Sequence, residues 1–194
     1  VINEATTSSS ITVPANVILR FTRKGSLTVT TGQTVAIAGP IEASPFKIFY
    51  NALPGQGTVA LSGPNNPVPP EWWGAVGDNS GDYRLPLQAW INAIIGTTEG
   101  FLPQGVYRCG GSLTATGSQL VIKGAGTRSR IMNTASANQP TFVGSALTEF
   151  DFSDFAIIGQ SANANDGIVL QDNSSCAHSG NGSFTRIGMN PNGK

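Results

Sequence analysis

Apolar and polar residues alternate in short runs along the first sixty positions of the chain. The apolar positions are Ile11, Val13, Val17, Leu19, Phe21, Leu27, Val29, Val35, Ile37, Ile41, Ile48, Val59 and Leu61. A period of two residues predicts β-strands with one buried face. The pattern also recurs, with 16 residues from Ile11 to Leu27 and 22 from Ile37 to Val59. Recurrence near 20 residues predicts stacked β-coils, each covering the apolar face of its neighbour.

Residues 85–96, LPLQAWINAIIG, change to the period of an α-helix. One helical face carries Leu87, Trp90, Ile91, Ile94 and Ile95. Asp82 is the expected N-cap and Gly96 the expected C′ residue, with Pro86 in the first turn. An amphipathic helix beside β-coils is expected to cover the open apolar end of the stack.

Short β-patterns follow the helix at residues 100–102, 105–108 and 120–124. The segment at residues 120–124 resembles residues 155–159 and 184–188. Each of the three ends in a glycine, and successive glycines lie 35 and 29 positions apart. Short strands in coils of about 30 residues, without intervening helices, predict a parallel β-helix. The chain stops at residues 190–194 with no closing element, so we expect a truncated solenoid.

Prolines set the expected domain boundary. They crowd residues 53–70, where only the short TVAL run reads as strand, because proline removes a ladder donor. The sequence therefore predicts a small leading β-module over residues 1–69 and a longer β-helix over residues 70–194.

Composition supports an all-β protein with frequent turns. Charged residues make up 11%, hydrophobic residues 39%, and the chain has 24 glycines and 12 prolines. Zero net charge gives no electrostatic footprint for nucleic acid. No apolar run approaches the roughly 20 residues that span a bilayer, so no membrane insertion is expected. Cys109 and Cys176 define neither a disulfide framework nor a zinc site, and their redox state stays open.

Four motifs, in order, resemble one known family. They are PEWWGAVGD at residues 70–78, the helix, LPQGVYR at residues 102–108 and LVIKGAG at residues 120–126. Together they resemble the pectate-lyase-like right-handed β-helix family, in the branch of bacteriophage tailspikes and surface-polysaccharide enzymes. The resemblance covers most of residues 10–131. The chain departs from the usual acidic loop at residues 79–81 and at Tyr83.

The resemblance implies a right-handed parallel β-helix with one N-terminal capping helix. It also implies a homotrimer in a phage tail, virion or extracellular setting, and polysaccharide bound on the long face or between subunits. Catalytic residues of this family usually lie in later coils, so no catalytic motif is carried over to this chain.

The densest acidic cluster supplies the best catalytic candidates. Glu149 and Asp151 are expected on the outer face of one strand, roughly 6–7 Å apart, a spacing that suits paired carboxylates of a glycoside hydrolase. Asp166 and Asp172 flank the next strand and are candidate partners, for catalysis or for Ca²⁺. The alternative is a solvated face above a phenylalanine core.

Other candidates have weaker support. Trp72 and Trp73 could stack on sugar rings, although packing between the leading coils and the helix is the competing role. A lyase would need a basic residue beside an acidic sugar, but Lys123, Arg128 and Arg130 are expected in a turn. His178, the sole histidine, has no evident partner.

The preferred hypothesis is therefore that this chain is the N-terminal part of a tailspike-like protein that binds polysaccharide and, if it is an enzyme, also cleaves it. The sequence does not choose between lyase and hydrolase. The alternatives are a non-catalytic structural or adhesive fibre segment and a self-assembling filament.

Overall fold

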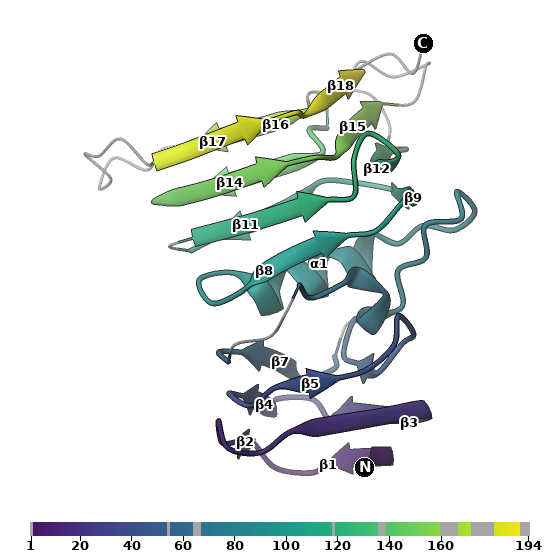
Figure 1. Cartoon of the computed structure of the whole chain (residues 1–194), viewed down its shortest axis with the longest axis vertical. Coiled ribbons are helices and arrows are strands. Elements are labelled where there is room, and N and C mark those ends of the chain that lie inside the picture. Colours follow the sequence, from purple (N-terminus) through teal and green to yellow (C-terminus); the bar gives the residue numbers. More distant parts are fainter. Residues whose placement is uncertain are drawn as a thin grey trace.

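The protein is an all-β, right-handed parallel β-solenoid of about six turns, as the sequence predicts. The computed structural model describes residues 2–53, 55–63, 67–117, 119–135, 139–159, 167–171 and 181–190. Within these ranges every paired strand runs parallel to its neighbour, and α1 (Arg84–Ile94) is the single α-helix. Figure 1 shows short coils below α1 and wider coils above it.

The lower coils contain seven strands. They are β1 (Ile2–Thr7), β2 (Ile11–Val13), β3 (Leu19–Val29), β4 (Thr34–Ile37), β5 (Ile41–Glu42), β6 (Phe49–Tyr50) and β7 (Thr58–Leu61). β2, β4 and β7 form one sheet, while the long β3 bends so that its two ends pair with β5 and with β1 and β6. Their alternating burial, such as exposed, buried, half-buried, buried along β7, confirms the period of two.

The expected alignment of these coils is wrong. Ile11 pairs with Val35, 24 positions on, and Leu27 pairs with Phe49, 22 positions on. The 16-residue offset from Ile11 to Leu27 links strands of different sheets, because each coil contains several apolar runs that look alike.

A proline-rich junction and the helix follow the lower coils. The 3₁₀ turn η1 (Pro70–Trp73) precedes α1, and α1 begins at Arg84, with Tyr83 as the N-cap residue. Asp82 is therefore not the N-cap residue, although its Oδ1 accepts the Arg84 N–H at 2.9 Å. Pro86 lies in the first turn as expected, and Gly96 follows the helix at φ 75°.

The upper coils contain three sheets. One has β8 (Glu99–Leu102), β11 (Gln119–Gly124), β14 (Glu149–Ser153) and β17 (Asn181–Thr185); the second has β9 (Gly105–Cys109), β12 (Ser129–Asn133), β15 (Ala156–Gly159) and β18 (Gly188–Asn190); the third has β10 (Leu113–Thr116), β13 (Phe142–Ser145) and β16 (Ile168–Gln171). Three strands per coil, joined by loops of unequal length, give the wide coils of Figure 1.

The expected pairing of the closing glycines is also wrong. Residues 120–124 pair with β14, whereas residues 156–159 pair with β12. At the corner after β14 the chain places Asp154 at φ 60°, and after β17 it places Arg186 at φ 51°. Non-glycine residues thus adopt the left-handed backbone conformation at these two corners. Spacings between glycines therefore do not give the length of the repeat.

The helix lies between the lower and the upper coils and packs against both. Its apolar face is buried against β7 below and β8 and β10 above, so it covers the end of the upper stack as expected. Beside the helix, Val68 pairs with the free edge of strand β8, donating to the Glu99 carbonyl and accepting from the Phe101 N–H. One hydrophobic cluster runs from Phe21 through α1 to Ile157, across the expected boundary at residues 69–70.

Candidate functional site

The outward side of the sheet β8, β11, β14 and β17 carries the acidic residues that the sequence singles out. Along β14, Glu149 is exposed, Phe150 and Asp151 are half-buried, and Phe152 and Ser153 are buried. The outward residues of the three lower strands are Glu99, Phe101, Gln119, Val121, Lys123, Glu149 and Asp151. We call this surface the carboxylate face.

The parallel register brings residues of different coils together on this face. Glu149 lies beside Gln119, whose Nε2 donates to Glu149 Oε2 at 3.0 Å. Asp151 lies beside Val121, and Val121 lies beside Glu99 on the next strand. Glu99 and Asp151, on different coils, therefore share one row, with their backbones about two strand spacings or roughly 10 Å apart.

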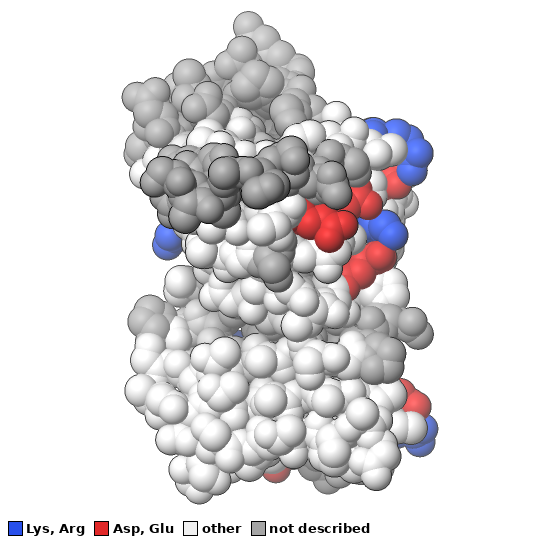
Figure 2. All heavy atoms as spheres, turned by 90° about the vertical axis from the view of Figure 1, so that its left-hand side faces the viewer, with Lys and Arg blue, Asp and Glu red and all other residues white. Residues whose placement is uncertain are grey.

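Lys123 lies among these carboxylates. Its Nζ donates to Glu99 Oε2 at 2.7 Å, and the pKa of Lys123 is raised by that hydrogen bond and, to a smaller extent, by the charge of Asp151. Figure 2 shows acidic and basic atoms gathered at the height of β8, β11 and β14. The ion pair is exposed, so it orders the two side chains more than it stabilises the fold.

The structure gives a mixed result for the predicted residues. Glu149 and Asp151 share the outer face as expected, two positions apart on one strand, while Phe152 is buried behind them. Asp166 and Asp172 lie outside the described residues, and so does His178. The catalytic and Ca²⁺ roles of this set remain predictions.

Two residues of the face were missed or misplaced by the sequence reasoning. Lys123 was expected in a turn, but it is an outward residue of β11. Glu99 was not considered, although the alternation in EGFL at residues 99–102 places it outward on β8. Arg130 is an exposed residue of β12 rather than of a turn, and its Nε donates to the Thr127 carbonyl.

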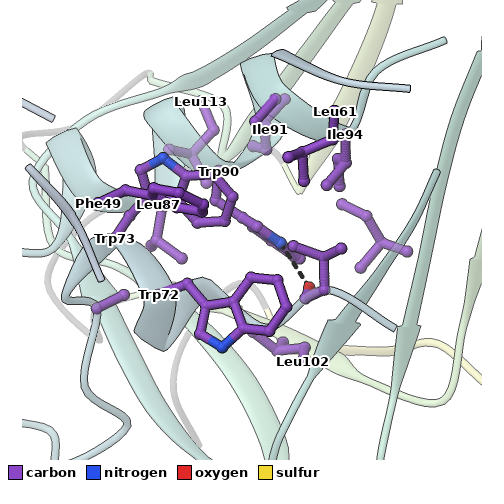
Figure 3. Close-up of a cluster of buried hydrophobic side chains, with 14 of the residues drawn as sticks. Phe49, Leu61, Trp72, Trp73, Leu87, Trp90, Ile91, Ile94, Leu102 and Leu113 are labelled. Atoms are coloured by element: carbon purple, nitrogen blue, oxygen red, sulfur yellow. Dashed lines mark hydrogen bonds between the residues drawn. The ribbon is translucent and has the colours of Figure 1, made fainter. Parts of the chain in front are cut away.

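Trp72 and Trp73 lie in the core at the junction of the two stacks. They are 4% and 0% exposed, and their rings contact Phe49 with centroids 6.3 and 5.0 Å apart. Figure 3 shows both indoles among side chains from α1, β6 and β8. Burial favours the packing role and leaves neither ring an open face for a sugar.

Two tyrosines near the junction bind acidic side chains, which the sequence reasoning did not anticipate. Tyr107 Oη donates to Glu71 Oε1 at 2.5 Å, and Tyr83 Oη donates to Asp78 Oδ1 at 3.1 Å. Hydrogen bonds from Ser80, together with the one from Tyr83, lower the pKa of Asp78, which makes it a turn residue that favours the ionised form. Burial acts on Glu71 in the opposite direction and raises its pKa.

Within the described part of the chain, no group of three or more His, Cys, Asp or Glu side chains is arranged to hold a metal ion. In the same residues no helix has the length and apolar character needed to cross a membrane.

Comparison with known proteins gives no match to a family model, to a curated protein or to a solved structure.

Proposed function

We propose that the chain is a rigid segment of a tailspike- or fibre-like surface protein, and that its carboxylate face binds an extended polysaccharide. The observation that supports this proposal is the row of acidic and amide side chains that crosses successive coils on one sheet. Glu149 lies beside Gln119 of the neighbouring coil, and Asp151 and Glu99 lie in a second row with Val121 between them. A polymer with repeating hydroxyls suits such a surface, because carboxylate and amide oxygens accept hydrogen bonds from hydroxyl groups.

Binding is better supported than cleavage. A glycoside hydrolase places two carboxyl groups around the scissile bond, with the general acid in a pocket shielded from solvent. Glu149 is exposed, and Asp151 is half-buried on the same side of β14. Polysaccharide cleavage by this protein would therefore need Asp166, Asp172 or later coils to complete the site.

A homotrimer in a virion or extracellular setting belongs to the same proposal. Its support is the motif resemblance of residues 70–126 together with the parallel solenoid. The surface between subunits would then be an uncharged side of the solenoid rather than the carboxylate face.

The second candidate is a structural fibre segment that binds no sugar. It is favoured by the sheet β2, β4 and β7, whose outward residues are small and uncharged: Thr12, Thr34, Ala36, Thr58 and Ala60. Figure 2 shows that most of the lower half is uncharged in this view. A flat, small-residue face suits close packing between solenoids.

The deciding experiment is polysaccharide binding by the full native protein, measured by calorimetry against a panel of neutral and acidic polymers. We expect Glu149→Gln with Asp151→Asn to weaken binding by at least about tenfold, the loss of about 1.4 kcal/mol of hydrogen bonding. Glu42→Gln, at an exposed acid of β5 paired with Arg20, is the matched control.

Unchanged binding in the double variant would remove the carboxylate face from the proposal. Absence of binding to every polymer, in a protein whose native mass shows a polymer of this chain, would favour the structural fibre.

A further inference from the structure

Strand β3 contains a bulge where it pairs with β1, at the lower end of Figure 1. The pairing offset is 19 positions from Ile2 to Phe21 but 22 positions from Glu4 to Ser26, so β3 has three more residues than β1 in this interval. The extra residues belong to the segment at positions 22–25, which we call the β3 bulge. Bulges change the direction of neighbouring side chains and are frequent beside functional sites.

The β3 bulge brings two cations to the same side of the chain. On a regular strand, neighbouring side chains point to opposite faces, which would separate Arg23 from Lys24. Here Thr22, Arg23 and Lys24 are all exposed, and all three line one cavity. Two adjacent positive charges repel each other, so this arrangement has an electrostatic cost that a negatively charged ligand would remove.

The cavity beside the β3 bulge has a volume of about 560 Å³ and opens to solvent. Glu4, on the edge strand β1, also belongs to its lining. Clefts that hold small ligands usually measure about 300–1,000 Å³. The cavity is therefore large enough for a small organic ligand and not only for a single ion.

Neither Arg23 nor Lys24 forms an ion pair with another described residue. The ion pairs of the described residues are Arg20–Glu42, Lys123–Glu99 and Arg186–Asp154. Arg20 shows the contrast on the same strand, because its guanidinium lies 2.6 Å from the Glu42 carboxylate. Since Glu4 is the one carboxylate among the residues that line the cavity, the lining carries a net positive charge.

The side chains of the cavity suit a ligand that carries an oxyanion beside hydroxyl groups. The Arg23 guanidinium presents a planar set of donors that binds a carboxylate, sulfate or phosphate through two parallel hydrogen bonds, and Lys24 adds a point charge. The Glu4 carboxylate only accepts hydrogen bonds, so it suits a hydroxyl group and repels a second anion. An acidic sugar has both kinds of group in one unit.

We propose that the cavity beside the β3 bulge binds an acidic sugar unit, whose oxyanion lies against Arg23 and Lys24 while one of its hydroxyl groups donates to Glu4. This site is separate from the carboxylate face, which lies in the upper coils and on which carboxylates outnumber cations. The proposal therefore does not depend on polysaccharide binding by the carboxylate face.

Nuclear magnetic resonance titration of the full chain tests the site, with sodium glucuronate, glucose and sodium sulfate as ligands. We expect glucuronate to shift the amide signals of residues 22–26 with a dissociation constant at least about tenfold lower than that of glucose or sulfate at low ionic strength. The reason is that only glucuronate offers both an oxyanion and hydroxyl groups. Raising the salt concentration to about 0.5 M should weaken its binding, because the two cations are exposed.

Variants identify the groups that carry the binding. Arg23→Gln with Lys24→Gln should weaken glucuronate binding by at least about tenfold. Arg128→Gln with Arg130→Gln removes the same charge from exposed residues of the upper coils and should retain the wild-type affinity. Glu4→Gln should strengthen sulfate binding, because a repelling carboxylate is lost, and should narrow the preference for glucuronate over sulfate.

Equal affinity for glucuronate and sulfate in the wild type would assign the cavity to free anions and overturn the acidic sugar. Equal affinity for glucuronate and glucose, no saturable shift at residues 22–26, or unchanged affinity in the Arg23→Gln/Lys24→Gln variant would overturn the site itself. If that variant does not fold, Glu4→Gln decides, and sulfate binding no tighter than in the wild type overturns the proposal. None of these outcomes bears on the carboxylate face, which is tested through Glu149 and Asp151.

Discussion

Gln88 of α1 is paired with Thr114 of β10 through its side-chain amide. Gln88 Nε2 donates to the Thr114 carbonyl at 2.7 Å, and the Thr114 N–H donates to Gln88 Oε1 at 2.8 Å. β10 is the edge strand of its sheet, so its backbone groups on that side have no strand to pair with. The amide of one side chain therefore takes the place of a neighbouring strand.

Replacing Gln88 by alanine should leave this edge unpaired. We expect Gln88→Ala to lower the free energy of unfolding by about 1–2 kcal/mol, because two hydrogen bonds to backbone are lost at a partly exposed site. Urea unfolding followed by circular dichroism measures the change. Gln104→Ala, at an exposed glutamine of the β8–β9 loop, is the control and should stay within about 0.5 kcal/mol of the wild type. Equal losses in the two variants would contradict the pairing.

Gly100 on β8 allows α1 to approach the upper stack. An added Cβ there would lie 2.5 Å from both Ile94 Cδ1 and Trp90 Cζ2. We expect Gly100→Ala to cost about 1–3 kcal/mol of stability, since a methyl group is forced into a filled core. Thermal unfolding at several denaturant concentrations gives the value.

A second substitution tests the cause. Ile94→Val removes the Cδ1 atom that the new methyl group would meet, and alone it should cost about 0.5–1.5 kcal/mol. The double variant should lose at least about 0.5 kcal/mol less than the sum of the single variants. Additive losses would show that the contact with Ile94 Cδ1 does not limit this position and would leave Trp90 Cζ2 as the limiting neighbour.

Phe152 is the centre of an aromatic cluster inside the upper coils. Its ring lies 5.5 to 6.0 Å, between centroids, from those of Phe142, Phe150, Phe155 and Phe184. Phe152 is 1% exposed, so Phe152→Ala should cost about 3–5 kcal/mol. Phe184 belongs to the same cluster but is 47% exposed, and Phe184→Ala should cost under about 2 kcal/mol. Similar costs in equilibrium unfolding would show that Phe184 is covered in the native particle.

The sequence predicts elements of this fold better than their alignment. The helix could be placed within two residues because Leu87, Trp90 and Ile91 lie on a face with a period that no strand shares. The coils could not be aligned, since loop lengths vary and every coil offers several similar apolar runs. The 22-residue step from Leu27 to Phe49 and the 30-residue step from Val121 to Asp151 have no common period.

The candidate site was predictable along one strand and not across strands. Alternation around Phe152 places Glu149 and Asp151 on one face, because side chains on a strand point alternately to its two sides. The approach of Glu99 and Lys123 depends on the register between coils, which the pattern does not contain. The Glu71–Tyr107 contact is also non-local, joining residues 36 positions apart.

Cys109 gives a chemical measure of how firmly the first upper coil is closed. Its thiol is 0% exposed, and burial raises its pKa from 9.0 to about 12. Because thiolate is the reactive form, three pKa units reduce its fraction at pH 8 by about 1000-fold before steric protection is counted.

In a Cys176→Ser background, we therefore expect iodoacetamide to label the native protein at least about 1000-fold more slowly than the urea-unfolded chain. Labelling followed by intact mass measures both rates. A native rate close to the unfolded rate would mean that β9 separates from the stack far more often than its burial in the core implies.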